Sequence, residues 1–317
     1  MRTVNVVCGI LAIAGVAVGA MAFWNPLGSG WSVGREVPPS DRVPIDAIRH
    51  DAWDRLLHAY VDGAGRVDYA RWKADGTEPL DDYLAELSRA DLEADAGLES
   101  TLAYWINAYN ALTIRGILRE YPTDSIRNHT SAIGGYNIWK DLTLRVGGEN
   151  VTLDEIEHQK LRPLDEPRIH FAIVCASNSC PRLLNEAYTA DAISSQLDSN
   201  AREFFSHGEN FRFTDSGDDR QTLVLSPILD WFGADFGVTI PERLERIADY
   251  VPADQREKLL DAGVELEFDE YDWRLNDRAT PPQRGEDTSG DADQSSADET
   301  DEADSDDGRR SGAKLVL

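Results

Sequence analysis

The central stretch Arg168–Leu183, RIHFAIVCASNSCPRL, constrains the fold more than any other segment of the chain. Its apolar run Ile169–Val174 lies between Pro167 and a Ser/Asn-rich break, a pattern that predicts a short buried strand. Cys180 directly precedes Pro181, and because proline fits the first turn of a helix, Cys180 is predicted to lie at a helix N-terminus. Free backbone N–H groups there would favour the thiolate form of a cysteine. We therefore expect any active site of this chain to include Cys180.

Cys180 is a candidate nucleophile for a hydrolase or an acyl transferase. A nucleophilic thiol needs a base within hydrogen-bond reach and a further group that orients the base. His158 and His170 are the candidate bases, and Asn107 or Asn110, inside a predicted long helix, is the candidate orienting residue. The alternative for the asparagines is a structural hydrogen bond to a neighbouring loop. For His170 the alternative is a satisfied core histidine, and for His158 it is a solvated surface position.

Two other roles remain open for Cys180. A disulfide with Cys175 would fix the loop between the two residues and leave no thiol to react. Alternatively, Cys180 could join Cys175, His158 and His170 as a set of nitrogen and sulfur ligands suited to zinc. The closely spaced ligand pairs typical of zinc sites are missing from the sequence. We therefore predict that the site uses neither a metal nor another cofactor.

Three aromatic residues, Trp105, Tyr109 and Trp139, are the candidate substrate-binding residues. Trp105 and Tyr109 lie on the predicted long helix, and Trp139 precedes a predicted strand. Rings along a groove would bind an unidentified peptide, ester or glycan, although the same rings could simply pack in the core. The groove supports a second class of function, a non-catalytic envelope module that binds a peptide or glycan. A free sulfur beside an imidazole would favour the enzyme, whereas a disulfide would favour the module.

The charge of the chain excludes nucleic acid as a default partner. The net charge is −27, and phosphate binding requires a basic surface. Acidic residues also pervade the region predicted to fold, and this indicates a protein kept soluble in high salt, where screening offsets self-repulsion. The alternative is an ordinary acidic protein that carries an acidic tail.

Four regions are predicted along the chain. Residues 1–24 form a charge-poor apolar run after Arg2, typical of a signal peptide or a membrane anchor. Residues 25–44 form a linker, residues 45–276 a folded domain, and residues 277–317 an acidic disordered tail that lacks apolar periodicity. The protein is therefore expected to be exported, in a periplasmic, extracellular or membrane-anchored location. The sequence leaves its oligomeric state open.

Apolar periodicity predicts an α+β fold, a mainly helical single domain with a small mixed or antiparallel sheet. This composition is compatible with a cysteine-hydrolase-like arrangement. Helices are predicted at 45–61, 80–87, 99–120, 190–206, 241–250 and 253–262, with further helix starts at Thr152 and Ser226. Strands are predicted at 142–146, 169–174, 211–213, 223–225 and 264–268.

Several segments together resemble the family catalogued as domain of unknown function 547. The resemblance covers about residues 47–276 and implies an exported α+β domain to which no activity is assigned. The Cys, His and Asn content is similar to that of papain-like and transglutaminase-like enzymes, but the order Asn, His, Cys is opposite to the papain order and would require a permuted topology. The segments are WDRLLHAYVDGAGRVDYARW, YWINAYNALTI, NIWK, LTLRVGGENVTLDEIEHQKLR, RIHFAIVCASNSCPRL and YDWRLN.

Overall fold

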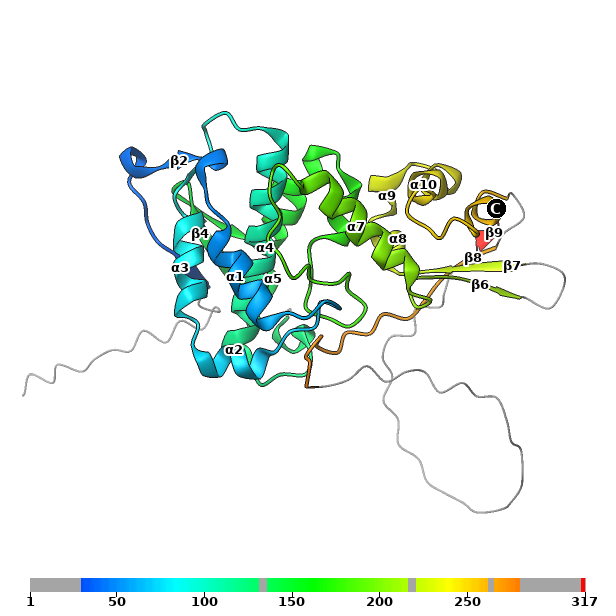
Figure 1. Cartoon of the computed structure of the whole chain (residues 1–317), viewed down its shortest axis with the longest axis horizontal. Coiled ribbons are helices and arrows are strands. Elements are labelled where there is room, and N and C mark those ends of the chain that lie inside the picture. Colours follow the sequence, from blue (N-terminus) through cyan, green and yellow to red (C-terminus); the bar gives the residue numbers. More distant parts are fainter. Residues whose placement is uncertain (1–29, 131–135, 216–220, 262–264, 280–314, 317) are drawn as a thin grey trace, which may run out of the picture.

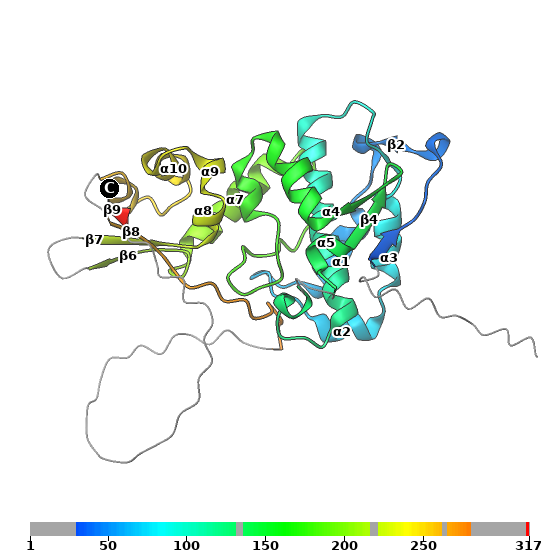
Figure 2. The same ribbon diagram turned by 180° about the vertical axis from the view of Figure 1, so that it is seen from behind.

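The computed structural model describes residues 30–130, 136–215, 221–261, 265–279 and 315–316. The predicted signal peptide or anchor and most of the predicted tail lie outside these residues. Figure 1 shows a mostly helical body with a smaller sheet-containing part at one end, and Figure 2 shows the same arrangement from behind. The predicted α+β class with small mixed sheets is confirmed.

Helix α4 (Leu98–Glu120) is the centre of the larger part. Its residues from Leu102 to Leu118 are buried almost without exception, so other elements must cover the helix on every side. Helices α2 and α3 contact α4 directly, and α1 packs on α3 (Figure 1). The bounds of these three helices are Asp51–Tyr60 for α1, Tyr69–Asp75 for α2 and Glu78–Leu87 for α3.

A three-stranded mixed sheet packs beside these helices. Strand β1 (Trp31–Gly34) runs parallel to β4 (Leu142–Val146), and β4 pairs antiparallel with β5 (Glu149–Thr152). The β4–β5 connection is Gly147–Gly148, both with positive φ, as a two-residue turn of type I′ requires. Because β1 lies within residues 25–44, the folded part extends upstream of residue 45.

The smaller part contains a second sheet with the order β6-β7-β8-β9 and its own apolar core. Helix α7 (Ile193–Ser206) connects the two parts, because Leu197 belongs to the larger core and Phe204 to the smaller one. Strand β9 places two residues of the predicted tail against β8. The remaining bounds are β6 Phe211–Asp215, β7 Gln221–Leu225, β8 Glu265–Phe268, β9 Leu315–Val316, α8 Ile228–Trp231, α9 Gly233–Phe236, α10 Ile240–Ile247 and α11 Arg256–Leu259.

Short elements complete the described chain. The predicted capping box is present, with the Thr152 side chain bonded to the Glu155 N–H and the Glu155 carboxylate bonded to the Thr152 N–H. These short elements are α5 Ile138–Asp141, α6 Leu153–Glu155, a π-helix Ile156–Leu161, strands β2 Val43–Pro44 and β3 Ala90–Asp91, and 3₁₀ helices Pro39–Asp41, Ile45–Ala47, Ile126–His129, Arg162–Leu164 and Pro167–Phe171.

The predicted strand at 169–174 is wrong. The segment is a 3₁₀ helix, Pro167–Phe171, followed by irregular chain. Its backbone groups bond to side chains in place of a neighbouring strand. Asn110 on α4 donates to the Ala172 carbonyl at 2.9 Å and accepts from the Val174 N–H at 3.0 Å, and Asn200 on α7 donates to the Phe171 carbonyl at 3.1 Å. A buried apolar run therefore needs no sheet here.

The helix predicted to begin after Cys180 is also absent. Residues 181–192 contain neither helix nor strand, and α7 begins only at Ile193. Distant side chains hold this loop. The Asn107 amide donates to the Tyr188 carbonyl at 2.8 Å and accepts from the Tyr188 N–H at 3.0 Å, and Gln196 donates to the Ala187 carbonyl at 3.0 Å. These bonds satisfy backbone groups that a helix would have paired internally.

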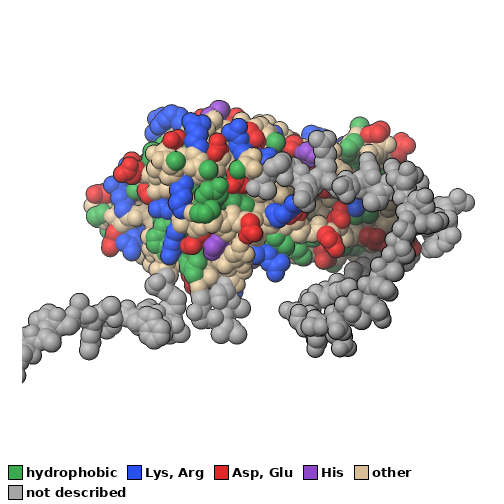
Figure 3. Space-filling view, turned by 90° about the horizontal axis from the view of Figure 1, so that it is seen from below, with side chains coloured by type: hydrophobic (Ala, Val, Ile, Leu, Met, Phe, Trp, Pro, Cys, Tyr) green, Lys and Arg blue, Asp and Glu red, His purple; other side chains and the backbone are tan. Residues whose placement is uncertain are grey.

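Charged side chains of both signs cover the surface. Figure 3 shows Lys and Arg interspersed with Asp and Glu over one face of the molecule. Several of them form ion pairs, such as Arg115 with Asp81 at 2.6 Å and Arg168 with Asp198 at 2.6 Å. Among the helices of the described ranges, none is long and apolar enough to cross a membrane.

Candidate functional site

A pocket of about 270 Å³ lies where the central stretch meets the π-helix, α8 and the C-terminal segment. It brings together five of the eight predicted site residues, namely Cys180, His158, His170, Tyr109 and Trp139. These residues come from α4, α5, the π-helix, and the beginning and end of the central stretch. The convergence of residues far apart in sequence on one concavity makes this the candidate functional site.

The other three predicted site residues have different surroundings. Trp105 is 3% exposed in the larger core, with Lys160 over its ring at 5.7 Å. Asn107 and Asn110 use both ends of their amides to hold backbone segments, which is the structural alternative considered for them. None of the three lines the pocket.

Cys175 and Cys180 are joined by a disulfide with their Cα atoms 6.3 Å apart. Both residues are half-buried and line the pocket. In this form Cys180 carries no thiol, so its predicted role as a nucleophile can apply only after reduction. Two donors converge on its sulfur, the Cys175 N–H at 2.9 Å and the Tyr271 hydroxyl at 3.2 Å.

His170 is held rigidly at the side of the pocket. Its Nε2 lies 2.8 Å from Asp235 of α9, its ring stacks on Phe232 at 4.2 Å, and Arg162 makes two bonds of 2.6 Å to the same aspartate. Burial lowers the pKa of His170 to about 4, against the opposing effect of Asp235. The ring is therefore neutral at neutral pH and donates its Nε2 proton to Asp235. Within the described part of the chain, the buried Nδ1 has no hydrogen-bond partner and carries a free lone pair.

His158 lies at the exposed rim of the pocket. It belongs to the π-helix Ile156–Leu161, and its Nδ1 accepts from Arg162 at 3.1 Å. Its Nε2 lies 3.9 Å from Asp154. This position agrees with the solvated alternative, and His170 has the more constrained geometry for a base.

Glu157 is a pocket residue that the sequence did not single out. Its side chain is buried, and Tyr109 donates to its Oε2 at 3.4 Å. Burial raises the pKa of Glu157 to about 7, and the Tyr109 hydrogen bond only partly opposes this. The carboxyl is therefore close to half-protonated at neutral pH and can exchange protons there. A π-helix shifts the phase of its side chains relative to an α-helix, so helical periodicity alone could not have placed Glu157 inside.

Three more aromatic residues form a wall of the pocket, which we call the aromatic wall: Trp231, Tyr271 and Trp273. Their ring centroids are 4.9 Å, 5.8 Å and 4.5 Å apart for Trp231–Tyr271, Trp231–Trp273 and Tyr271–Trp273. Trp231 is 48% exposed, so part of the wall faces solvent. Sequence reasoning missed these residues as binding residues. The available signal was the YDWRLN segment, in which two aromatic residues follow the last predicted strand.

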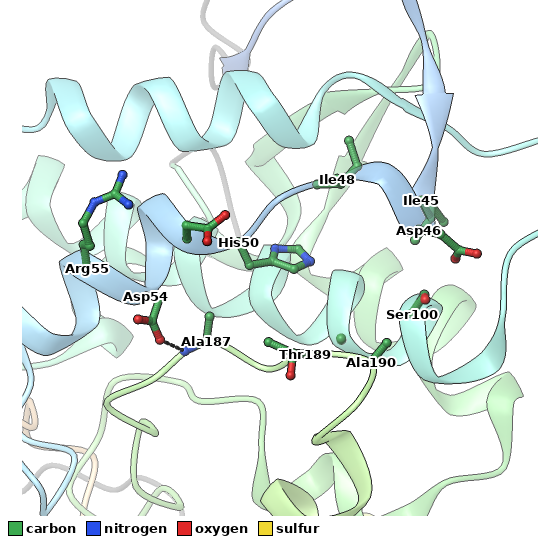
Figure 4. A pocket seen from close by; sticks show the side chains of 12 residues that line it. Ile45, Asp46, Ile48, His50, Asp54, Arg55, Ser100, Ala187, Thr189 and Ala190 are labelled. Carbon is green, nitrogen blue, oxygen red and sulfur yellow. Dashed lines mark hydrogen bonds between the residues drawn. The ribbon is translucent and has the colours of Figure 1, made fainter.

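A larger pocket of about 540 Å³ lies between the start of α1, the start of α4 and the loop before α7. Figure 4 shows His50 and Asp54 among its lining residues. Both are used structurally, because His50 bonds the Tyr83 hydroxyl at 2.8 Å and Asp54 accepts from the Ala187 N–H at 3.0 Å (Figure 4). Burial lowers the pKa of His50 to about 4. This pocket contains no cysteine and is the weaker candidate.

The segment that carries α4 and the central stretch also carries the family resemblance. Residues 95–205 match the model of the family described as protein of unknown function, DUF547. The resemblance predicted for residues 47–276 is confirmed over this DUF547 segment, which contributes Tyr109, Glu157, His170 and both cysteines to the pocket. The aromatic wall and Asp235 lie beyond it. No curated protein and no solved structure matches the chain.

Proposed function

We propose that the pocket is the binding site of a peptide- or glycan-binding module. The observation that carries this proposal is the aromatic wall, with the half-exposed Trp231 at the pocket mouth. Rings with an apolar face and a polar edge are the residues that most often anchor ligands at protein surfaces. The disulfide supports the same function, because it removes the thiol that catalysis by Cys180 would need.

The size and charge of the pocket restrict the kind of ligand group that it can bind. Ligand sites commonly measure about 300–1,000 Å³, so a pocket of about 270 Å³ accommodates one sugar ring or one amino-acid side chain. Asp154 and Glu157 line the pocket and accept hydrogen bonds or attract cations. The ligand group that enters is therefore a hydroxylated ring or a basic or aromatic side chain, not an anion.

Binding arrays test this proposal. The purified protein is applied to a peptide array and a glycan array, and the best hit is titrated by calorimetry. Trp231→Ala should weaken binding by about tenfold or more, as truncation of an interface anchor does. Leu98→Ala is the matched control, because Leu98 is 49% exposed at the start of α4. Equal affinity of both variants and the unaltered protein would exclude the aromatic wall as the binding surface.

A second function, a cysteine hydrolase or acyl transferase, is favoured by the free Nδ1 of His170. In the dithiol form Cys180 would attack an ester or amide carbonyl and His170 would take the thiol proton. Asp235, not Asn107 or Asn110, would orient the imidazole. The test is release of a chromophore from an activated ester by reduced protein. Cys180→Ser and His170→Gln should each abolish the acylation burst, and a burst that survives both would reject this function.

We also propose that the protein is exported, on the basis of the apolar segment at residues 1–24. Cell fractionation with protease protection tests this proposal. Protein found only inside intact, protease-resistant cells would contradict it.

A further inference from the structure

We propose that the Cys175–Cys180 disulfide is itself a reactive group that exchanges with a dithiol substrate, namely a cysteine-containing polypeptide. This activity is separate from ligand binding at the aromatic wall. It rests on three features: the disulfide lines a pocket, its loop is held by other bonds, and hydrogen-bond donors surround its sulfurs.

The disulfide lies where a substrate thiol can reach it. Cys175 and Cys180 are half-buried and line the same pocket as His170 and Glu157. A disulfide that only staples a core is sealed from solvent, whereas exchange requires an approach to one sulfur. The pocket of about 270 Å³ supplies that approach for one side chain.

The loop between the two cysteines is held without the disulfide. The N–H of Asn178 donates to the Arg274 carbonyl at 2.8 Å, and its side chain donates to Asp272 at 3.0 Å. Ser179 adds a bond from its hydroxyl, which accepts from the Asp272 N–H at 2.8 Å. These contacts with residues 272–274 keep the loop in place after reduction, so a purely structural disulfide would be redundant here.

Donors surround both sulfurs of the disulfide, and one donor with a fixed direction distinguishes them. The Tyr271 hydroxyl lies 3.2 Å from each sulfur, and the Ser177 hydroxyl lies 3.1 Å from the Cys175 sulfur. The Cys175 N–H, whose direction is fixed by the backbone, donates to the Cys180 sulfur at 2.9 Å. A disulfide sulfur is a weak acceptor and a thiolate a strong one, so these donors stabilise mainly the thiolate that forms when the bond breaks. Because the backbone N–H favours that thiolate on Cys180, we assign Cys180 as the leaving sulfur and Cys175 as the sulfur that is attacked.

The exchange balances without any further reagent. One substrate thiolate attacks the Cys175 sulfur, the Cys175–Cys180 bond breaks, and its electron pair goes to Cys180. The second substrate thiolate then attacks the substrate sulfur of the mixed disulfide and releases Cys175. The products are a substrate disulfide and the protein dithiol, and the two substrate protons end on Cys175 and Cys180. Two electrons pass from substrate to protein.

Exchange kinetics of the oxidised full chain test the proposal. The probes are dihydrolipoamide and a synthetic peptide with two cysteines, mixed with folded protein, quenched in acid, alkylated and measured by mass spectrometry. Disulfide transfer should occur under native conditions at a rate proportional to probe concentration. A disulfide that reacts only at the rate of global unfolding would overturn the proposal.

Variants test the assigned polarity. Tyr271→Phe keeps the ring but removes a donor that lies 3.2 Å from both sulfurs, and should slow transfer about threefold to tenfold. Tyr60→Phe is the matched control, because its hydroxyl bonds the surface residue Asp75 and leaves the pocket untouched. With the oxidised peptide, Cys180→Ser should accumulate a mixed disulfide at Cys175, faster than Cys175→Ser does at Cys180. Equal rates for both tyrosine variants would refute the role of the donors, and the opposite cysteine preference would refute the polarity.

The exchange result is separable from the binding result. Calorimetry of the unaltered, oxidised protein measures its affinity for any array ligand of the aromatic wall. A variant with both cysteines replaced by serine should lose transfer, and circular dichroism shows whether that variant is folded. Ligand binding by the unaltered protein without disulfide transfer under native conditions would defeat only the exchange proposal.

Discussion

Single polar side chains inside the molecule decide both the path of the chain and the chemistry of the pocket. Asn110 substitutes for a neighbouring strand by bonding the backbone on both sides of Ile173. Glu157 and His170 are buried titratable groups beside one pocket, with their pKa values moved in opposite directions by the same cause, which is burial. In mildly acidic solution both side chains are therefore mainly uncharged, whereas an exposed glutamate and an exposed histidine would mainly carry charge.

Asn110→Ala should destabilise the protein by roughly 2–4 kcal/mol. The change leaves the Val174 N–H and the Ala172 carbonyl buried without their partner, and each such group costs about 1–3 kcal/mol. Urea unfolding followed by fluorescence gives the difference. Asn128→Ala at an exposed position is the control and should change stability by less than about 0.5 kcal/mol. A near-neutral result for Asn110→Ala would show that the loop finds other partners.

Glu157→Gln should change how stability depends on pH. The pKa of Glu157 is raised from 4.5 to about 7 in the folded state, so the folded state binds the proton more tightly than the unfolded state. Stability from this group is fully present below about pH 4.5 and is lost as pH rises toward 7. The total loss is at most about 3 kcal/mol, since one pKa unit corresponds to about 1.4 kcal/mol.

Unfolding midpoints at pH 5 and pH 8 for both proteins provide the measurement. The glutamine variant should gain stability relative to the unaltered protein at pH 8. His170 also contributes to the pH dependence of stability, but it does so in both proteins. Only the difference between their two pH profiles therefore reports on Glu157. Parallel pH profiles for the two proteins would show that Glu157 ionises normally.

At the scale of elements, helix α7 joins two apolar cores. Leu197 packs into the larger core, and Phe204 and Phe205 pack into the smaller one. The stripe predicted from sequence is the buried face of this helix, because Leu197 and Phe204 are each 1% exposed. The pocket lies between elements of both parts, so its geometry depends on how α7 holds them together.

Leu197→Ala and Phe204→Ala should each destabilise the protein by roughly 2–5 kcal/mol, as buried truncations do. Ser194→Ala, on the exposed face of the same helix, is the control and should be nearly neutral. Thermal and urea unfolding give the magnitudes. If the three variants have similar stability, the two cores do not depend on α7 packing.

At the scale of the whole molecule, the main electrostatic feature is the excess of acidic over basic residues. The chain has 58 acidic and 31 Lys and Arg residues, so its self-repulsion is large at low ionic strength. Ion pairs such as Arg115–Asp81 act in the opposite direction, but exposed pairs are worth only about 0–1 kcal/mol each.

Removal of salt should therefore destabilise the protein. Between molar and millimolar salt we expect a fall of at least about 1 kcal/mol, or roughly 2–4 °C in the unfolding midpoint for a domain of this size. Scanning calorimetry at several salt concentrations measures the shift, with a neutral osmolyte as the control for non-ionic effects. A flat midpoint would mean that local ion pairs already balance the excess of acidic residues.

Elements whose signals are local can be predicted from the sequence. The helices α4 and α7, the β6–β7 hairpin and the Thr152 capping box were all predicted, because periodicity, turn residues and caps lie within a few residues of one another. The same reasoning selected Cys180 and His170, since their types and their place in the central stretch are visible without a fold. It left the state of the cysteines open.

The shape of the central stretch and the composition of the pocket depend on contacts between distant parts of the chain. Whether residues 169–174 become a strand depends on a pairing partner, and asparagines of α4 and α7 replaced that partner from 62 and 29 residues away. The aromatic wall reaches the pocket, and Asp235 reaches His170, from segments well beyond Cys180 in sequence, so no local pattern could place them there. Burial shifts the pKa values of Glu157 and His170, and burial is a property of the packed molecule rather than of the residues themselves.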